Sequence, residues 1–174
     1  MAHPAEIHVV AGAIADRDGR VLIAQRPRGR HMAGRWEFPG GKLDAGEDSF
    51  AGLARELAEE LGIEVRKARR LIRLRHDYPD RCVLLDVWQV TDYAGEPQAL
   101  DAQALAWAFP DELPKHDLLE ADRAIVTALR LPRLARALAP GESLQSIRGS
   151  AAQTILVPVP GADADVLDAD AVRA

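Results

Sequence analysis

The sequence has one cysteine, Cys82, and few aromatic residues: three Trp, two Tyr and three Phe among 174 residues. A single cysteine cannot form an internal disulfide, which favours a reducing compartment such as the cytoplasm. No apolar run approaches the ~20 residues needed to span a bilayer. The N-terminus, MAHPAEIHVV, lacks the basic segment and apolar core of a secretory signal. We therefore expect a cytoplasmic protein with no membrane association.

The sequence also lacks an excess of positive charge, since 22 Lys and Arg stand against 27 Asp and Glu, for a net charge of −5. This balance argues against a general nucleic-acid-binding surface. A small anionic substrate stays compatible with it, because a bound cation can reverse the local field. The hydrophobic content of 48% is sufficient for a packed core, and the length suggests one domain with room for an appendage. The composition leaves the oligomeric state open.

The hydrophobic pattern predicts intermixed strands and helices. A hairpin signal, Asp16-Arg17-Asp18-Gly19, separates the first two predicted strands. A short strand around Trp36 is expected to be cut off by Pro39-Gly40-Gly41. The expected strands cover 7–15, 21–25, 36–38, 64–74, 82–90 and 105–109. The fold class is therefore α/β (α+β) with a mixed sheet.

The C-terminal third changes in composition. Asp117 and Glu120 resemble a capping box and predict the start of a helix, with Ala121, Ile125 and Leu129 on one face. From about residue 131 the chain is rich in Ala, Pro, Gly and Asp. We expect a domain over residues 1–131 and a partly ordered appendage over 132–174, in which TILVPV is an isolated strand.

A helix predicted over residues 49–61 has an unusual charge distribution. Its apolar positions recur at spacings of three and four, and Gly62 is expected to end it: Phe50, Leu53, Leu57 and Leu61. Its last turns nevertheless carry Glu56, Glu59 and Glu60. Carboxylates at a helix C-terminus are unfavourable by roughly 0.3–1 kcal/mol each. Neighbouring like charges add perhaps ~0.2–0.5 kcal/mol per pair.

These three carboxylates share an arc of about 100° beside the apolar arc of the helix. Clustered carboxylate oxygens are what a hard cation such as Mg²⁺ requires, and this ion often bridges to substrate phosphates. A solvated acidic face is the alternative interpretation. The preceding Pro39-Gly40-Gly41 and the nearby Glu47 favour the metal site.

The spacing of these residues resembles the Nudix box. Gly41, Glu47 and the segment RELAEELGI (residues 55–63) agree with its defined positions. The stretches VLIAQRP, HMAGRWEFPGGK, YPDR and GEP look like the MutT-type branch, whose members are nucleoside triphosphate pyrophosphohydrolases. The resemblance covers about residues 5–131. It implies a Nudix fold, with a mixed sheet sandwiched between helices and the box forming a loop, a helix and a second loop.

The resemblance also implies roles within the box. The metal, Mg²⁺ or Mn²⁺ in its place, would be bound by Glu56, Glu59, Glu60 and the backbone carbonyl of Gly40. One of the box glutamates, with Glu56 favoured and Glu59 also counted as catalytic, would act as the base or orient the attacking water, and Arg55 would orient the carboxylates. An ordinary surface ion pair is the alternative for Arg55. The remaining box residues would be scaffold: Gly41, Glu47 and Gly62.

Outside the box the resemblance implies a further metal ligand, Asp101, where the family usually has the longer glutamate; a plain loop aspartate is the alternative. It implies phosphate or ribose contacts from Arg26, His31 and Arg81, which suit charge-assisted bonds. A surface cation is the alternative for each of these three. Phe38 is expected either to line the base pocket or to belong to the core.

Asp122 takes the position where the purine-selective pattern of this branch has an asparagine. An ionised aspartate only accepts hydrogen bonds, which suits the N1–H and amino donors of guanine. The alternative is an acid in the first turn of a helix. We therefore expect an enzyme that hydrolyses a nucleoside triphosphate to the monophosphate and pyrophosphate, with guanine or 8-oxoguanine as the base. Two alternatives are a CTP-type pyrimidine diphosphatase and a non-catalytic Nudix nucleotide-binding regulator; the intact box favours the enzyme.

Overall fold

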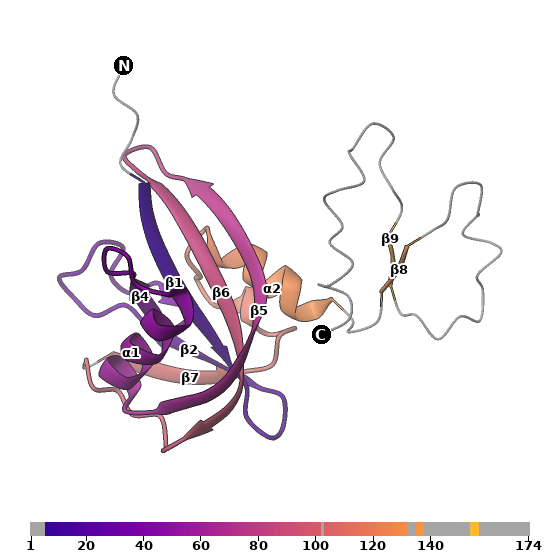
Figure 1. Ribbon diagram of the computed structural model, residues 1–174, viewed down its shortest axis with the longest axis horizontal. Coiled ribbons are helices and arrows are strands. Elements are labelled where there is room, and N and C mark those ends of the chain that lie inside the picture. Colours follow the sequence, from indigo (N-terminus) through magenta and orange to yellow (C-terminus); the bar gives the residue numbers. More distant parts are fainter. Residues whose placement is uncertain (1–5, 102, 132–134, 138–153, 157–174) are drawn as a thin grey trace. The chain divides into compact units, whose positions relative to one another are not determined.

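The first predicted strand lies inside a mixed sheet (Figure 1). The computed structural model describes residues 6–101, 103–131, 135–137 and 154–156. In the larger sheet β1 pairs in parallel with β6 and antiparallel with β4, and β5 pairs antiparallel with β6. The order β4-β1-β6-β5 joins β4 (Gly40–Lys42), β1 (Glu6–Ile14), β6 (Cys82–Ala94) and β5 (Glu64–Asp77).

A second, antiparallel sheet continues from the end of β1. Its order β3-β2-β7 joins β3 (Trp36–Glu37), β2 (Val21–Gln25) and β7 (Ala104–Ala108). The predicted hairpin connects the two sheets, because the Asp16 side chain accepts hydrogen bonds from the backbone N–H groups of Asp18 and Arg20 at 2.9 and 2.8 Å. The predicted mixed α+β class is confirmed.

Helix α1 (Ser49–Leu61) has the predicted bounds because both of its ends are set by local signals. The Asp48 side chain accepts from the N–H groups of Phe50 and Ala51, and Gly62 ends the helix at a φ of 68°. The helix packs closely on β1, where a Cβ added at Gly12 would lie 2.9 Å from Leu57 Cδ1.

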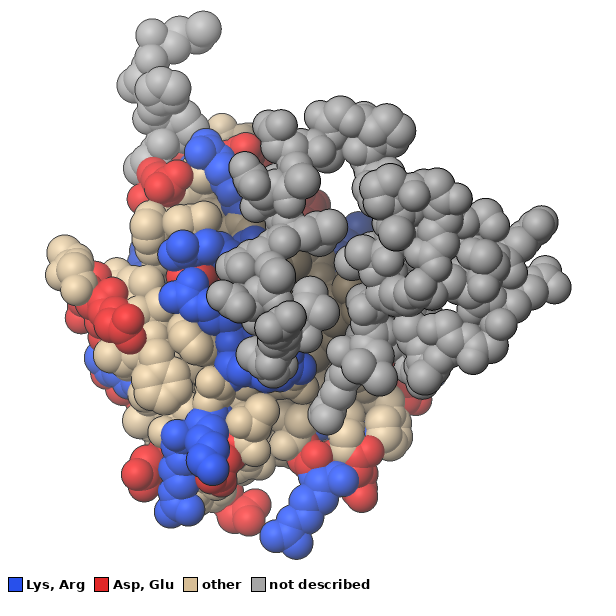
Figure 2. All heavy atoms as spheres, turned by 45° about the vertical axis from the view of Figure 1, so that its right-hand side comes forward, with Lys and Arg blue, Asp and Glu red and all other residues tan. Residues whose placement is uncertain are grey.

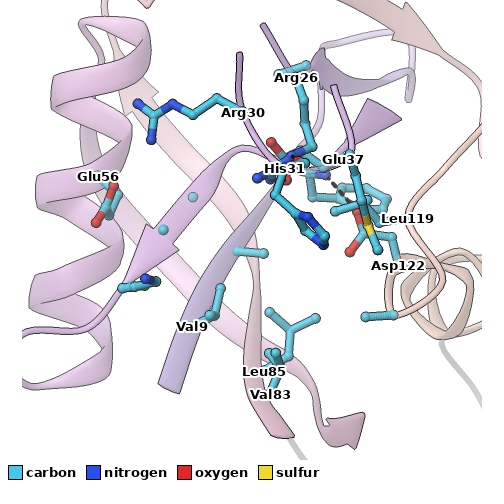
Figure 3. Close-up of a pocket in the computed structure, with 18 of the residues that line it drawn as sticks. Val9, Arg26, Arg30, His31, Glu37, Glu56, Val83, Leu85, Leu119 and Asp122 are labelled. Carbon is cyan, nitrogen blue, oxygen red and sulfur yellow. Dashed lines mark hydrogen bonds and ion pairs between the residues drawn. The ribbon is translucent and has the colours of Figure 1, made fainter. Parts of the chain in front are cut away.

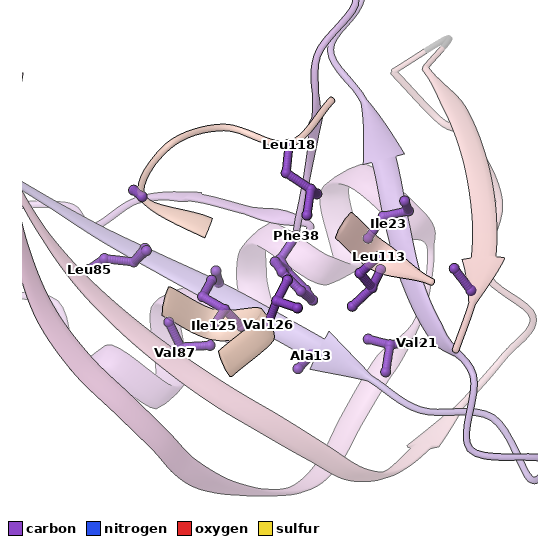
Figure 4. Packing of buried hydrophobic residues seen from close by; sticks show 13 residues of the cluster. Ala13, Val21, Ile23, Phe38, Leu85, Val87, Leu113, Leu118, Ile125 and Val126 are labelled. Atoms are coloured by element: carbon purple, nitrogen blue, oxygen red, sulfur yellow. The ribbon is translucent and has the colours of Figure 1, made fainter. Parts of the chain in front are cut away.

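Alternation along β1 divides the core into two clusters. One lies between α1 and the sheet and includes Val10, Ile14, Leu53 and Leu57. The other lies against α2 (Asp122–Arg130) and η1 (Leu113–Lys115) (Figure 4). It contains Ala11, Ala13, Val21, Ile23, Phe38, Leu85, Val87, Ala108, Leu113, Leu118, Ala121, Ile125 and Val126. The two helices therefore cover different faces of β1, with the sheet between them.

One local prediction was wrong, one strand was not predicted, and two strands are longer than expected. Residues 117–119 do not begin the second helix; Trp36 N donates to the carbonyl of Asp117 at 2.9 Å, and Leu119 N donates to the carbonyl of Trp36 at 3.0 Å. This pairing keeps the segment extended and delays the helix to Asp122. The glycines after Pro39 do not only terminate a strand, because Gly40–Lys42 forms β4 on the edge of β1. Strands β5 and β6 also run past residues 74 and 90, since they pair along their whole length.

Strand β5 is strongly basic and ends the larger sheet. Its exposed cationic residues are Arg66, Lys67, Arg69, Arg70, Arg73 and Arg75. Figure 2 shows that Lys and Arg side chains are numerous on one face of the molecule. The Arg73 guanidinium contacts the buried Asp86 carboxylate at 2.8 and 2.9 Å, and the Arg70 guanidinium lies 5.0 Å from the Trp88 ring.

Residues 131–174 form a separate unit. Within it, β8 (Ala135–Ala137) pairs in parallel with β9 (Thr154–Leu156), which begins the predicted TILVPV strand. The rest of the predicted appendage, residues 132–134, 138–153 and 157–174, lies outside the described residues, and its assignment stays a prediction. No helix in the described part of the chain is long and apolar enough to cross a membrane.

Candidate active site

A cavity of about 560 Å³ brings most of the predicted site residues together. Figure 3 shows Glu56 on α1 on one side of this cavity and Asp122 on the other, with His31 and Arg30 between them. The predicted residues that line it are Arg26, His31, Phe38, Gly40, Gly41, Glu56, Glu59, Glu60, Arg81, Asp101 and Asp122. Glu47, Arg55 and Gly62 are not among its lining residues.

Two glycines allow α1 and β4 to approach each other at the acidic end of the cavity. Gly40 has a φ of 150°, and a Cβ there would lie 2.1 Å from the carbonyl oxygen of Val10. Its N–H donates to Glu60 Oε2 at 3.1 Å. A Cβ at Gly41 would lie 2.3 Å from Glu56 Oε2. At Gly40 the backbone of β1 therefore occupies the space that a side chain would fill, and at Gly41 the Glu56 carboxylate occupies it.

Arg55 connects the box loop to the acidic helix. Its Nε and Nη2 donate to the two carboxylate oxygens of Glu47 at 2.9 and 2.8 Å. Its Nη1 donates to Glu56 Oε1 at 2.9 Å and to Glu59 Oε2 at 3.5 Å, and its Nη2 also donates to the carbonyl of Lys42 at 3.1 Å. The guanidinium lowers the pKa of Glu47 to about 2. Arg55 thus holds the loop and two of the box carboxylates in one network.

The electrostatics of Glu60 fit a divalent cation. Burial raises its pKa to about 7, and the nearby carboxylates of Glu37, Glu56 and Asp101 contribute to the increase. A divalent cation would offset this repulsion, and carboxylate oxygens are its preferred ligands. Among the described residues, no three His, Cys, Asp or Glu side chains lie close enough together to hold a metal ion. Glu56 and Glu59 instead accept from Arg55, and Glu60 accepts from Gly40.

Arg26 lines the cavity and is held in place by Glu37, which was not among the predicted site residues. Its Nη1 forms an ion pair with Glu37, and its Nε donates to the carbonyl of His31 at 2.8 Å. Burial raises the pKa of Glu37, whereas Arg26 acts in the opposite direction. Apart from its place in the WEFPGG stretch, nothing in the sequence marks Glu37 as a site residue. Its role depends on the contact with Arg26, eleven residues earlier.

The remaining charged residues line more open parts of the cavity. The Asp101 side chain is 49% exposed, and its Oδ2 lies 3.9 Å from Arg30 Nη2. It also contributes to the raised pKa of Glu60, which places its charge near the acidic end. Arg81 pairs with its neighbour Asp80, and this contact lowers the pKa of Asp80.

Asp122 is buried at the opposite end, with a relative exposure of 5%. Its Oδ2 accepts from the backbone N–H of Phe38 at 3.1 Å. Burial raises its pKa to about 8, and the charge of Glu37 adds to the increase. The raised pKa favours a neutral carboxylic acid, which can also donate a hydrogen bond, over the ionised, accept-only side chain that the sequence suggested. Phe38 is buried in the core, which is one of its two expected placements, and it also lines the cavity; its place in a base pocket stays a prediction.

Apolar side chains form the floor of the cavity beside Asp122, as Figure 3 shows for Val9, Val83 and Leu85. Tyr78 and Leu119 also line this part. The sequence does not mark these residues as part of the site, because alternating apolar residues in strands carry no signal that separates a cavity wall from the core. The acidic end suits a cation that binds phosphates, and the half-apolar end suits a flat ring. One cavity with both ends therefore suits a ligand that has phosphates at one end and a ring at the other.

The fold is similar to that of solved MutT proteins. A solved MutT structure, described for Aliivibrio salmonicida and Vibrio cholerae, matches with a TM-score of 0.62 and 33% identity, over 71% of this chain and 96% of that chain. Residues 10–128 match the sequence profile described as NUDIX domain. The chain belongs to the Nudix family and is a Nudix hydrolase. Members of this family generally use divalent metals and act on small nucleotide substrates.

Two curated relatives differ in the base that their names specify. The CTP pyrophosphohydrolase of Escherichia coli is 42% identical over 130 residues, which cover 75% of this chain and 96% of the relative. A putative 8-oxo-dGTP diphosphatase 2 of Mycobacterium tuberculosis is 47% identical over 122 residues, covering 70% of this chain and 86% of the relative. Both relatives therefore align with nearly the whole described Nudix unit.

Proposed function

We propose that this hydrolase is a nucleoside triphosphate pyrophosphohydrolase that removes oxidised guanine nucleotides such as 8-oxo-dGTP, and also dGTP, with Mg²⁺ or with Mn²⁺ in its place. The observation that carries this proposal is the single cavity that joins the acidic end of α1 to the buried Asp122. Free nucleotides in the cytoplasm, rather than nucleic acids, are the proposed substrates, and the single cysteine supports that compartment. Such an activity would cleanse the nucleotide pool and so act in DNA repair.

The metal ligands in this proposal are Glu56, Glu59, Glu60, Asp101 and the carbonyl of Gly40. When bound, a divalent cation would neutralise the charge of the phosphate oxygens and activate a water molecule. Glu56 accepts a proton from the attacking water, whose oxygen bonds to phosphorus while the bond that joins the α- and β-phosphates breaks. Arg55 keeps the Glu56 carboxylate oriented through its 2.9 Å contact with Oε1. The scaffold role assigned to Glu47 is supported by its paired contacts with Arg55.

The cationic residues are assigned to the substrate. Arg26, His31 and Arg81 line the cavity, where their side chains can form charge-assisted bonds to phosphate or ribose oxygens. Arg26 is already immobilised by Glu37 and the carbonyl of His31, so little side-chain freedom is lost when a phosphate binds.

The base is assigned to the end that contains Asp122, Phe38 and the apolar floor. A neutral Asp122 presents one O–H donor and an acceptor oxygen. These groups match the O6 acceptor and the N1–H donor of guanine or 8-oxoguanine. The Phe38 N–H is a further donor at this end, at present directed to Asp122.

The test is a panel of dGTP, 8-oxo-dGTP, CTP and the other common nucleoside triphosphates, assayed with Mg²⁺ and with EDTA. We expect pyrophosphate and the monophosphate as products, no turnover in EDTA, and the highest kcat/KM for 8-oxo-dGTP. Release of orthophosphate, or full activity in EDTA, would contradict the proposed chemistry.

CTP is the second candidate because two observations favour it. The relative that is 42% identical is named for CTP, and the neutral form of Asp122 also matches the N3 acceptor and the N4 amine of cytosine. An ionised Asp122 would match only the amine. The ratio of kcat/KM for 8-oxo-dGTP to that for CTP is therefore expected to increase as the pH rises through about 8. A pH-independent ratio would show that Asp122 does not select between these bases.

A further inference from the structure

Gln103 has a polar group that the assigned chemistry does not use. The residue is 7% exposed and lines the cavity that Glu60 and Asp101 also line. Its Nε2 donates to the main-chain carbonyl of Glu60 at 3.2 Å. Its Oε1 is buried and has no hydrogen-bond partner among the described residues. A buried amide oxygen without a partner is unfavourable and requires an explanation.

The orientation of this amide is fixed by its surroundings. Exchanging the two ends of the amide would place Oε1 against the carbonyl oxygen of Glu60, and the hydrogen bond would be replaced by repulsion. Oε1 must therefore occupy the unpartnered position, and rotation of the terminal group cannot relieve it.

Capping of α1 does not explain the residue. The carbonyl of Glu60 also accepts from the backbone N–H of Leu100 at 3.1 Å, so it has a donor without Gln103. An apolar side chain of similar size could fill the same space and would leave no oxygen unpaired. The oxygen itself, rather than the amine, is therefore the feature that a function must use.

We propose that Gln103 is a positioning residue of the divalent-cation site, whose Oε1 accepts a hydrogen bond from a water held by the cation, while its amine fixes the Glu60 backbone. This inference rests on the proposed function, which places the cation at Glu60. A divalent cation such as Mg²⁺ keeps several of its waters and so presents donors to a nearby neutral oxygen. Asp101, whose side chain is half exposed, would then act from the open side of the same site and Gln103 from the buried side.

The experiment measures Mn²⁺ binding to the full chain without substrate, by the electron paramagnetic resonance signal of free Mn²⁺. Gln103→Leu removes Oε1 at similar volume, and we expect its Kd for Mn²⁺ to rise by about tenfold. Its free energy of unfolding in EDTA is expected to equal or exceed that of the wild type, because an unpaired buried oxygen has been removed. The matched control is Gln98→Leu, an exposed residue of the same loop that does not line the cavity.

A Kd for Gln103→Leu within twofold of the wild type, or an equal increase in Gln98→Leu, would overturn the inference. Gln103→Glu provides a second readout, because it keeps acceptor oxygens but loses the amine that contacts Glu60. We expect it to bind Mn²⁺ at least as tightly as the wild type, even if it is less stable in EDTA; weaker binding would assign the residue a structural role. Failure of the wild type to bind Mn²⁺ would instead overturn the proposed function, and the inference with it.

Discussion

Replacing Asp122 by Asn tests how the end of the cavity around Asp122 is built. Asp122 is buried, and its pKa is raised from 3.8 to about 8. The pKa of Asp122 is higher in the folded state than in the unfolded state. Its contribution to the free energy of unfolding is therefore complete below about pH 3.8 and is lost as the pH rises to about 8. At about 1.4 kcal/mol per tenfold change in proton affinity, the upper limit of this loss is roughly 5–6 kcal/mol.

The actual loss is expected to be smaller, because neighbouring groups relax and water can enter. An asparagine has nearly the same shape, stays neutral, and can still accept from the Phe38 N–H. We therefore expect Asp122→Asn to be more stable than the wild type at pH 8.5 by roughly 2 kcal/mol or more, with the difference declining toward pH 4.

The assay is urea unfolding of both proteins between pH 4 and pH 8.5. The free energy of unfolding of the variant minus that of the wild type is followed as a function of pH. Its change with pH reports on Asp122, because all other titrating groups are common to both proteins. Asp111→Asn, at a side chain that is 80% exposed, reports the effect of removing a surface carboxylate. Parallel stability curves for the wild type and Asp122→Asn would refute the argument that burial keeps this carboxyl neutral.

Three further predictions concern the acidic end. Glu56→Gln and Glu60→Gln should each lower kcat by about a hundredfold or more, yet keep their stability in EDTA, since loss of a charge relieves repulsion. If either variant is unfolded without metal, these acids are structural. Gly41→Ala should lower kcat and reduce stabilisation by Mn²⁺ in thermal unfolding, because its Cβ would lie 2.3 Å from Glu56 Oε2. Turnover equal to the wild type would show that the carboxylate can move freely. Arg55→Lys should lower kcat by about tenfold, because lysine cannot reproduce the two parallel bonds to Glu47. An unchanged kcat would count against this orienting role.

The sequence predicts features that depend on neighbouring residues and misses those that depend on distant ones. The bounds of α1 follow from Asp48 and Gly62, which lie next to the helix and act on its own backbone. The start of α2 does not follow from Asp117, because the backbone there pairs with Trp36, some eighty residues earlier. Strand β4 was missed for the same reason, since its glycines are extended only through pairing with β1.

The same distinction applies to the site. The box acids could be identified because their spacing and their unfavourable helix position are visible in a short stretch of chain. The protonation of Asp122 could not be predicted, since it arises from burial against residues that are distant in sequence. Glu37 and Gln103 were missed because each is defined by one long-range contact, to Arg26 and to the carbonyl of Glu60.

The arginine-rich strand β5 has a consequence for how this enzyme can be altered. It ends the larger sheet, and charged side chains on a terminal strand discourage pairing with the sheets of other molecules. No residue of β5 lines the cavity. Resistance to aggregation and substrate choice are therefore encoded on different segments of the chain. Mutagenesis of the cavity can explore new nucleotides without altering β5, and neutralising β5 should impair solubility before it impairs turnover.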